Sequence, residues 1–244
     1  MSGPVIIADG LVKRYKKQTV VHGVSFTVEP GEVFGLLGPN GAGKTTTILM
    51  LLGLTEISAG RAEVLGQDPQ RHPLEVKQRL GYMPDSVGFY DDLSARENMR
   101  YTARLLGIGP NERDERISQA LERVSLGDQA DKKVGAYSHG MRRRLGLAEI
   151  IMKQARVAIL DEPTSGLDPQ STESFLLLIE ELKADGVSIV ISSHLLDQMQ
   201  RICDRVALFG SGRIVLNGRV DELTADTPSL AEVYQRTFST GTRS

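Results

Sequence analysis

The segment between Val33 and Leu52 constrains the fold more than any other part of the chain. A run of apolar residues, Val33 to Leu37, is followed by a glycine-rich stretch and then by a helical pattern that continues to Leu52. The glycine-rich stretch, Gly38–Thr45, fits the pattern G-x-x-x-x-G-K-[ST]. A buried strand that leads through such a turn into a helix is a building unit of parallel sheets. The sequence therefore predicts an α/β core.

The glycine-rich stretch is suited to holding phosphate groups. Its glycines let several backbone N–H groups face one anion, and the dipole of the following helix points at the same place. We expect Lys44 to hold the β- and γ-phosphates of a nucleotide, Thr45 to offer its hydroxyl to Mg²⁺, and Thr46 to support the α-phosphate. The residues expected at the phosphates are Gly38, Pro39, Asn40, Gly41, Ala42, Gly43, Lys44, Thr45 and Thr46.

Short apolar runs flanked by turns recur along the chain and are typical of buried strands. They occupy positions 5–8, 20–28, 33–37, 157–160, 187–191, 206–209 and 214–216. Helical patterns lie between several of them, at 44–52, 171–183 and 195–203, which favours a largely parallel sheet. Turns at Gly31 and Gly66, in a strand-rich N-terminal part, predict an antiparallel β flap beside that sheet.

The segment from about Asp91 to Lys153 shows helical patterns and no convincing strand, so we expect an inserted helical subdomain. Ser94-x-x-Glu97 is a capping-box pattern at the start of one helix, and Asn111 is expected to cap the next. The apolar residues spaced for one buried face are Ile117, Leu121 and Val124.

Composition excludes some classes of function. The 244 residues are 40% hydrophobic, which is enough for a full core, and a net charge of −2 argues against chain-wide attraction to nucleic acid or anionic lipid. A local basic cluster, Arg142–Arg144, is interpreted as charges on a helix surface. Cys203 has no cysteine to pair with, and we expect it to be buried. Because neither a bilayer-spanning apolar run nor a signal-peptide pattern is found, we expect a cytoplasmic protein.

Three polar residues follow apolar runs farther along the chain. Asp161 and Glu162 end the run that begins at Val157, and His194 ends the run that begins at Val187. Ligands bind at the carboxyl ends of parallel strands, so these side chains are expected to meet the glycine-rich stretch at one edge of the sheet. We expect Asp161 to bind the Mg²⁺ shell, Glu162 to polarise a water for attack on the γ-phosphate, and His194 to donate to that phosphate.

A further motif spans Tyr137–Leu145, where Ser138 and Gly140 form a Ser-x-Gly turn that opens a basic helix shortly before the acidic pair. Such a turn offers a hydroxyl and a helix N-terminus to an anion. These donors would reach a triphosphate and lose contact with a diphosphate. The motif therefore suggests an ATP site that a second subunit completes.

With these motifs in this order, the chain resembles the nucleotide-binding subunit of ATP-binding cassette (ABC) transporters over nearly its whole length. The resemblance adds Tyr15, which is similar to the aromatic residue that stacks on adenine, and Ser165–Asp168, which is similar to the D-loop. It implies a RecA-like P-loop NTPase core with an antiparallel β flap and an inserted helical subdomain. The implied boundaries are 1–88 and 154–244 for the core and 89–153 for the helical signature subdomain.

The resemblance also implies an activity and partners. It implies an ATPase that uses ATP and Mg²⁺, in which two copies meet head to tail. Ser138 and Gly140 of one copy would then contact the γ-phosphate held by Lys44 of the other. This homodimer would drive integral membrane permease subunits from the cytoplasmic face of the membrane, and no nucleic acid is expected.

Two regions resemble the exporter-like subfamily that includes ABC-2 and drug-exporter ATPases. They are the Tyr-x-Pro-acid pattern at 82–85 together with the signature, and the tail at 229–234. The segment 81–94 also has some resemblance to the ATPase of the nitrous-oxide-reductase copper maturation transporter. Phe89 and Tyr90 either line a groove for a membrane subunit or pack between the subdomains.

Two positions depart from the family pattern. His139 stands where the signature commonly has glycine, and we expect its imidazole to face solvent. Asp85 stands where the Q-loop commonly ends in Gln or Glu, and it is assigned to Mg²⁺. Because aspartate is one methylene shorter than glutamate, a bridging water would carry this contact.

Two other classes of protein stay open at this point. A soluble ABC protein that acts on ribosomes or nucleic acid would share the motifs, although such relatives usually carry two cassettes or a long coiled-coil insertion. A P-loop kinase would leave the signature, Ser165–Asp168 and His194 unexplained. The cargo of a transporter is not encoded in these motifs.

Overall fold

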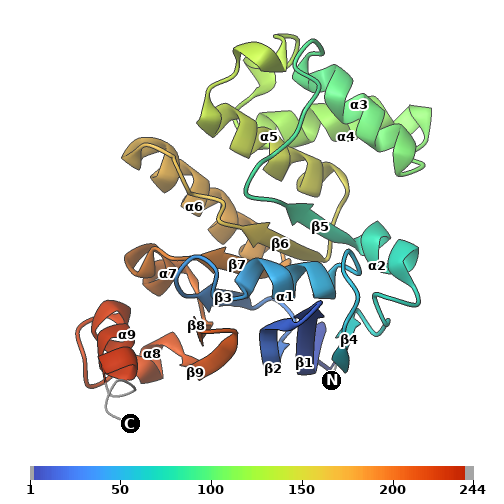
Figure 1. The fold of residues 1–244 in the computed structure, drawn as a ribbon. Coiled ribbons are helices and arrows are strands. Elements are labelled where there is room, and N and C mark those ends of the chain that lie inside the picture. The colour runs from blue at the N-terminus through green and yellow to red at the C-terminus, as the bar shows by residue number, and fades with distance from the viewer. Residues whose placement is uncertain (1–2, 240–244) are drawn as a thin grey trace.

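A six-stranded sheet forms the centre of the molecule in the computed structural model, which describes residues 3–239 (Figure 1). Its strand order is β5-β6-β7-β3-β8-β9. The neighbours from β5 to β8 are parallel, and β9 is antiparallel to β8. The strands are β3 (Val33–Leu37), β5 (Leu80–Met83), β6 (Val157–Asp161), β7 (Ser188–Ser193), β8 (Arg205–Gly210) and β9 (Arg213–Arg219). Every residue of β3, β6 and β7 is buried, as expected for parallel strands covered on both faces.

A second sheet is the predicted antiparallel flap, with the strand order β2-β1-β4. Its strands are β1 (Ile6–Tyr15), β2 (Gln18–Val28) and β4 (Ala59–Val64). The sequence patterns indicated β1 and β2 and missed β4, whose residues Ala-Gly-Arg-Ala-Glu-Val show little apolar alternation. They also missed β5, which is only four residues long.

Helices cover both faces of the central sheet. Alternate residues of β3 face opposite apolar clusters, since Val33 and Leu37 belong to one cluster and Phe34 and Leu36 to the other. The flap and α1 build the second cluster, and α5, α6 and α7 build the first. The helices outside the subdomain are α1 (Lys44–Leu51), α2 (Pro73–Arg79), α6 (Pro169–Ala184), α7 (Leu196–Ile202), α8 (Val220–Leu223) and α9 (Leu230–Ser239).

The helical insertion stands apart from the sheet at one end of the molecule (Figure 1). It contains α3 (Ala95–Leu105), α4 (Pro110–Arg123) and α5 (His139–Met152), with 3-10 turns at Gly127–Gln129 and Val134–Ala136. The predicted capping box is present, because the Ser94 hydroxyl accepts from Glu97 N and the Glu97 carboxylate accepts from Ser94 N. The expected cap at Asn111 is wrong: α4 begins at Pro110, and Gly109 is the N-cap.

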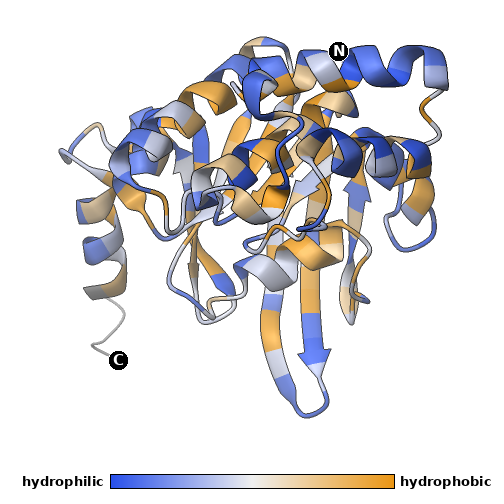
Figure 2. Cartoon of the chain, turned by 90° about the horizontal axis from the view of Figure 1, so that it is seen from above, coloured by the Kyte–Doolittle hydropathy of each residue, from blue (hydrophilic) through white to orange (hydrophobic). Residues whose placement is uncertain are grey.

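The distribution of hydropathy follows this architecture. In Figure 2 the strands are largely orange, whereas the helices that surround them carry blue residues. Ile117, Leu121 and Val124 are fully buried, as their spacing predicts. Within residues 3–239, no helix combines the length and the apolar composition that a bilayer crossing requires.

Candidate functional site

The loop between β3 and α1 depends on glycines at two close approaches. Gly38 has φ of 151°, and a Cβ added there would lie 2.5 Å from the carbonyl oxygen of Phe209. Gly43 has φ of 101°, and its added Cβ would lie 3.1 Å from the carbonyl oxygen of Val20. The loop is therefore held between β8 and β2 in a conformation that L side chains rarely adopt.

The start of α1 is open to an anion. No side chain caps this helix at Gly43, so its first N–H groups have no acceptor from a cap. They point in the direction in which the helix dipole favours negative charge. The described loop thus has the backbone geometry expected of a phosphate cradle.

Lys44 folds back over this loop. Its Nζ donates to the carbonyl oxygens of Gly38 at 2.7 Å and Pro39 at 3.3 Å. The same nitrogen lies 3.2 Å from Glu162 Oε1 in an ion pair, and the lysine side chain is only 5% exposed. The buried Lys44 ammonium and the carboxylate of Glu162, which directly follows β6, therefore lie together above the loop.

Asp161 and Glu162 differ in their surroundings. Asp161 is buried at the end of β6, where its Oδ1 accepts a short hydrogen bond from Ser192 Oγ of β7. The same Ser192 hydroxyl accepts from Glu162 N at 3.0 Å. One side chain thus fixes both acids, and it is a site residue that the sequence patterns missed. The signal that could have found it is a serine pair, Ser192 and Ser193, at the end of an otherwise apolar strand.

Glu162 sits in a strained backbone conformation and joins the predicted catalytic residues. Its φ is 46°, in the left-handed region that glutamate seldom adopts. Its Oε2 lies 2.9 Å from His194 Nδ1, opposite the Oε1 that faces Lys44. Oε1 is buried and, among the described residues, has no hydrogen bond of good geometry. The structure therefore brings Lys44 and His194 to the two oxygens of the Glu162 carboxylate.

The predicted Mg²⁺ residues do not form a complete metal site by themselves. Within residues 3–239, no cluster of three or more acidic, histidine or cysteine side chains could hold a metal ion alone. Mg²⁺ usually takes one or two protein oxygens and completes its shell with phosphates and waters. The exposed Thr45 hydroxyl and the Asp161 carboxylate fit such a partial set.

Asp85 has a different partner in the structure. Its Oδ1 lies 3.2 Å from Arg143 Nη2, and Arg143 Nη1 donates to the carbonyl oxygen of Pro84 at 3.0 Å. Arg143 is 2% exposed, so the interpretation of the basic cluster as surface charge is wrong at this position. Burial, followed by the charges of Asp161 and Asp85, raises the pKa of Tyr82 to about 12. Asp85 therefore balances a buried cation of α5 while lying close enough to act on the same tyrosine as Asp161.

Two exposed or partly exposed aromatic residues concern the nucleotide site. Tyr15 ends β1 and is 47% exposed, with Lys13 Nζ 4.8 Å from the centre of its ring. Tyr234 of α9 lines a pocket of about 350 Å³ together with the loop and His194. An exposed ring is thus available for the adenine contact predicted for Tyr15.

The Ser-x-Gly turn of Ser138 to Gly140, called the signature turn below, begins α5, and Ser138 and His139 in it are exposed. Ser138 is the N-cap of this helix, and its Oγ accepts from Met141 N at 3.2 Å. His139 is exposed as expected, yet its Nε2 lies 3.1 Å from the carbonyl oxygen of Ser165, so the imidazole has a protein partner and does not simply face solvent. Gly140 packs closely, because an added Cβ would lie 3.0 Å from Ser171 Oγ.

A groove separates the helical insertion from the core. Two adjoining pockets of about 280 and 350 Å³ share Thr102 and Glu149. Tyr90 is 55% exposed in this groove, and its ring meets that of Tyr101 edge to face with centres 5.3 Å apart. Phe89 is instead partly buried against the apolar core. Phe89 and Tyr90 both line the groove, so the contacts of this aromatic pair fit both interpretations.

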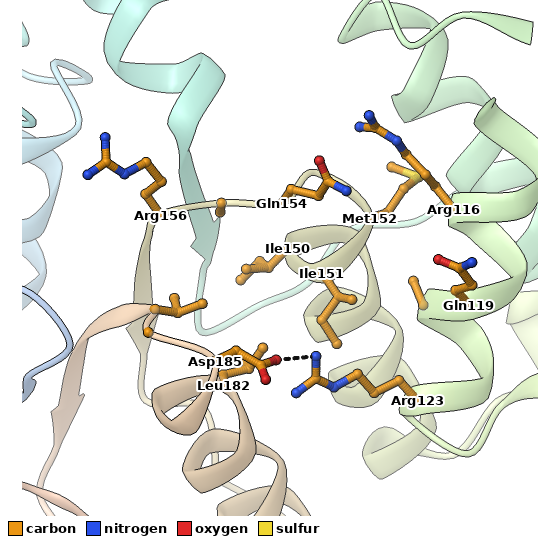
Figure 3. A pocket seen from close by; sticks show the side chains of 14 residues that line it. Arg116, Gln119, Arg123, Ile150, Ile151, Met152, Gln154, Arg156, Leu182 and Asp185 are labelled. Atoms are coloured by element: carbon orange, nitrogen blue, oxygen red, sulfur yellow. Dashed lines mark ion pairs between the residues drawn. The ribbon is translucent and has the colours of Figure 1, made fainter.

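Another cavity, of about 640 Å³, lies at the opposite edge of the sheet, where β6 and β7 begin (Figure 3). Arg123 of α4 forms an ion pair with Asp185 after α6 at 2.5 Å across it. This edge is remote from the phosphate loop, which precedes α1 at the carboxyl end of β3. The pair ties the helical insertion to the core without joining the site.

The loop, the buried lysine and the carboxylates at the strand ends define a P-loop nucleotide-hydrolysing protein. The ABC transporter family model matches residues 21–165. The chain is 39% identical over 222 residues to Nod factor export ATP-binding protein I of Ralstonia nicotianae, which covers 91% of this chain and 69% of the relative. It is 39% identical over 211 residues to the ABC transporter ATP-binding protein NatA of Bacillus subtilis, covering 85% of this chain and 86% of the relative.

A solved structure of an ATP-binding subunit of an ABC transporter superposes with a TM-score of 0.87 at 28% identity, covering 96% of this chain and 99% of that one. The chain belongs to the ABC transporter family, as an ATP-binding subunit related to export-type ATPases. The predicted α/β fold and ATPase activity are thereby confirmed, and ATP is its nucleotide.

Proposed function

We propose that two copies of this chain hydrolyse ATP at two shared sites and so power the membrane permease of an export-type transporter. The observation that carries this proposal is the contrast between two motifs. The catalytic residues at the phosphate loop contact one another, whereas Ser138 is exposed and, in the part of the chain that the structure describes, its hydroxyl bonds only within its own helix. A second copy would bring such a serine to the exposed side of the loop.

Lys44, Glu162 and His194 lie at the edge of the sheet beside the phosphate loop, which we call the phosphate edge. Within one copy, this edge supplies the groups for hydrolysis. The N–H groups at the start of α1 and the Lys44 ammonium would hold the phosphates, and Tyr15 would stack on the base. A triphosphate competes with Glu162 for Lys44, because both are anions and Lys44 Nζ lies 3.2 Å from that carboxylate. The freed Glu162 would accept a proton from the attacking water, and His194 would donate to the γ-phosphate.

Thr45 and Asp161 are the residues proposed to hold Mg²⁺. The ion would neutralise charge that develops on the phosphate oxygens. Asp161 is oriented for this role by Ser192 Oγ, which donates to its Oδ1. Asp85 is proposed to contact Mg²⁺ only through a bridging water, because its carboxylate already pairs with Arg143 at 3.2 Å.

Across the interface, Ser138 and Gly140 are proposed to sense the γ-phosphate of the partner copy. Hydrolysis would remove the group they bind, and the copies would separate. The domain boundaries proposed for this movement are 1–88 and 154–244 for the core and 89–153 for the helical signature subdomain.

Size-exclusion chromatography with light scattering tests this proposal on the Glu162→Gln variant. The variant should bind ATP with Mg²⁺, lose turnover and elute as a dimer, since binding is kept while water activation is lost. With ADP it should elute as a monomer. The double variant Lys44→Ala/Glu162→Gln is the matched control and should stay monomeric in ATP. A Glu162→Gln chain that binds ATP and stays monomeric at high concentration would refute the shared site.

The permease is proposed to dock at the groove that contains Tyr90, Tyr101 and Glu149, on the cytoplasmic face of the membrane. An exposed aromatic pair beside a largely apolar groove suits a protein interface. The names of the relatives, which include a Nod factor export protein, support export as the direction. Purification from detergent-solubilised membranes should recover an integral membrane protein with the chain. Recovery of ribosomes or nucleic acid instead would favour the soluble ABC alternative.

A further inference from the structure

His139 connects the signature turn to the loop that follows the catalytic acid. Its Nε2 lies 3.1 Å from the carbonyl oxygen of Ser165. A carbonyl oxygen only accepts hydrogen bonds, so Nε2 carries the proton in this contact. The ring also packs on the loop, since a Cβ added at Gly166 would lie 3.6 Å from the same nitrogen.

The loop continues this connection to Glu162. Ser165 N donates to the carbonyl oxygen of Glu162 at 3.1 Å, which closes a turn directly behind the acid. Glu162 has φ of 46°, and this conformation is kept by its surroundings rather than by its own preference. Its backbone is held by hydrogen bonds to Ser165 and Ser192, while its carboxylate is held by Lys44 and His194. A shift of Ser165 would therefore move the backbone that aims the Glu162 carboxylate.

A second contact supports the same connection on the far side of the loop. Gly140 lies so close to Ser171 that an added Cβ would meet its Oγ at 3.0 Å. Ser171 in turn donates from N, at 2.9 Å, and from Oγ, at 2.5 Å, to the Asp168 carboxylate that caps α6. These two hydrogen bonds lower the pKa of Asp168, so its carboxylate stays ionised as the cap. The signature turn thus contacts Ser165 at the start of the loop 165–168 and Ser171 in the first turn of α6, which the loop leads into.

We infer that His139 is a positioning residue that couples the two shared ATP sites through Ser165. In the proposed dimer, the signature turn of one copy contacts the partner's nucleotide, while Glu162 of that copy serves its own. When the signature turn of one copy contacts the partner's nucleotide, the path from His139 through Ser165 to Glu162 would align the Glu162 carboxylate at that copy's own nucleotide. This inference rests on the proposed head-to-tail dimer and adds a role for a residue outside both sets of phosphate contacts.

Steady-state ATPase measurements on three full-length variants test the inference. His139→Leu fills similar space without a donor and should lower kcat about tenfold, the effect of one lost hydrogen bond, with KM for ATP unchanged. The Hill coefficient for ATP should fall toward 1. His139→Gln keeps an N–H donor and should restore kcat to within about threefold of the natural chain. Arg142→Leu, at a neighbouring and partly buried position of the same helix where the side chain pairs with Asp91, is the control and should change kcat little.

The outcomes separate this inference from the proposed function. Equal kcat values for His139→Leu, His139→Gln and the natural chain would overturn the positioning role. A rise in KM without a fall in kcat would also overturn it, because that pattern reports weakened ATP-driven closure instead. Dimerisation of the Glu162→Gln chain with ATP is measured separately, and its failure would refute the shared site itself. Thermal melts of both histidine variants show whether the fold is intact.

Discussion

The phosphate edge and the signature turn hold their polar groups in opposite ways. At the phosphate edge, Lys44, Glu162 and His194 contact one another, and Ser192 fixes both acids. At the signature turn, Ser138 is exposed and, among residues 3–239, its hydroxyl accepts only from Met141 N of its own helix. The catalytic groups of the first region already have partners in a single chain, whereas the serine hydroxyl of the second is open to another molecule. In the proposed dimer, the helical insertion would therefore supply the half of the site that acts on the partner copy.

The largest expected effect concerns the acid of the phosphate edge. Glu162→Gln should lower kcat by at least about a hundredfold, the usual contribution of a general base. ATP affinity should hold, since Lys44 and the loop are intact. Turnover and equilibrium nucleotide binding measured on the same preparation check this. Glu173→Gln, an exposed acid that pairs with Arg201, is the control and should keep normal turnover.

The second prediction compares the two regions directly. In dilute single chains, Lys44→Ala should weaken ATP binding at least about tenfold, because a charge-assisted contact is lost. Ser138→Ala should leave that binding unchanged and should abolish ATP-driven dimerisation in the Glu162→Gln background. Fluorescent nucleotide titration and light scattering measure the two properties.

Ser94→Ala is the matched control for this pair. Like Ser138→Ala, it removes an N-cap hydroxyl and should cost about 1 kcal/mol of stability. It should not affect dimerisation, since Ser94 is buried in the helical insertion. Equal loss of dimerisation in both variants would mean that helix stability, and not contact with a partner, explains the signature serine.

A smaller effect is expected for the junction between the two regions. Asp85→Asn removes the charge opposite Arg143, which is 2% exposed, so the free energy of unfolding should fall by about 1–2 kcal/mol. The drop is limited because Asp85 itself is 63% exposed. Denaturant unfolding gives the value. If Asp85 contributes only a water-mediated contact to Mg²⁺, turnover of the variant should change less than about threefold. A loss of turnover of about a hundredfold would instead show that Asp85 is a direct ligand of Mg²⁺.

The smallest expected effect is a pH-dependent change in stability at Glu149, which lines the groove. Desolvation raises the pKa of Glu149, although Thr102 Oγ1 donates to its carboxylate at 2.6 Å and Lys153 lies nearby. Because the pKa of Glu149 is raised in the folded state, folding favours the protonated side chain. This contribution to stability is complete at pH values below the ordinary pKa of 4.5, and it is lost as pH rises through the pKa of the folded state. Glu149→Gln should therefore stabilise the chain at pH 7, by less than about 1 kcal/mol, and show no gain near pH 4.

Glu97 gives a control of opposite sign. The hydrogen bonds from Ser94 lower its pKa, so its stabilisation is present at neutral pH and is lost as pH falls through the folded value. Glu97→Gln should lower the melting temperature at pH 7. A pH series of thermal melts on both variants would contradict this account if the two changes had the same sign.

Much of the phosphate edge could be predicted from the sequence because its geometry is local. Strand, loop and helix follow one another at 33–52, and parallel strands deliver Asp161 and His194 to the same edge whatever the rest of the chain does. The residues that the patterns missed act through tertiary contacts. Ser192 reaches both acids from a neighbouring strand, and Arg143 is buried only because α5 packs beside Pro84 and Asp85.

The signature turn shows the same limit. Ser138 predicts the start of α5, yet the contact between His139 and Ser165 joins positions that are 26 residues apart in the sequence. No periodic pattern encodes such a contact, since it depends on how the helical insertion rests on the core. Short or polar strands, such as β5 and β4, were missed for a related reason: their pairing partners, not their own residues, make them strands.

Disulfide cross-linking between two different chains tests the shared site most directly. One chain carries Asn40→Cys and the other Ser138→Cys, both exposed positions, and both chains carry Glu162→Gln and Cys203→Ala, which removes the single natural cysteine. Mixed and mildly oxidised with ATP and Mg²⁺, they should form a covalent heterodimer, while neither chain alone should link to itself. With ADP the heterodimer should be absent. Cross-linking that is the same in ATP and ADP, or that fails in ATP while Glu162→Gln dimers form, would contradict head-to-tail closure around the γ-phosphate.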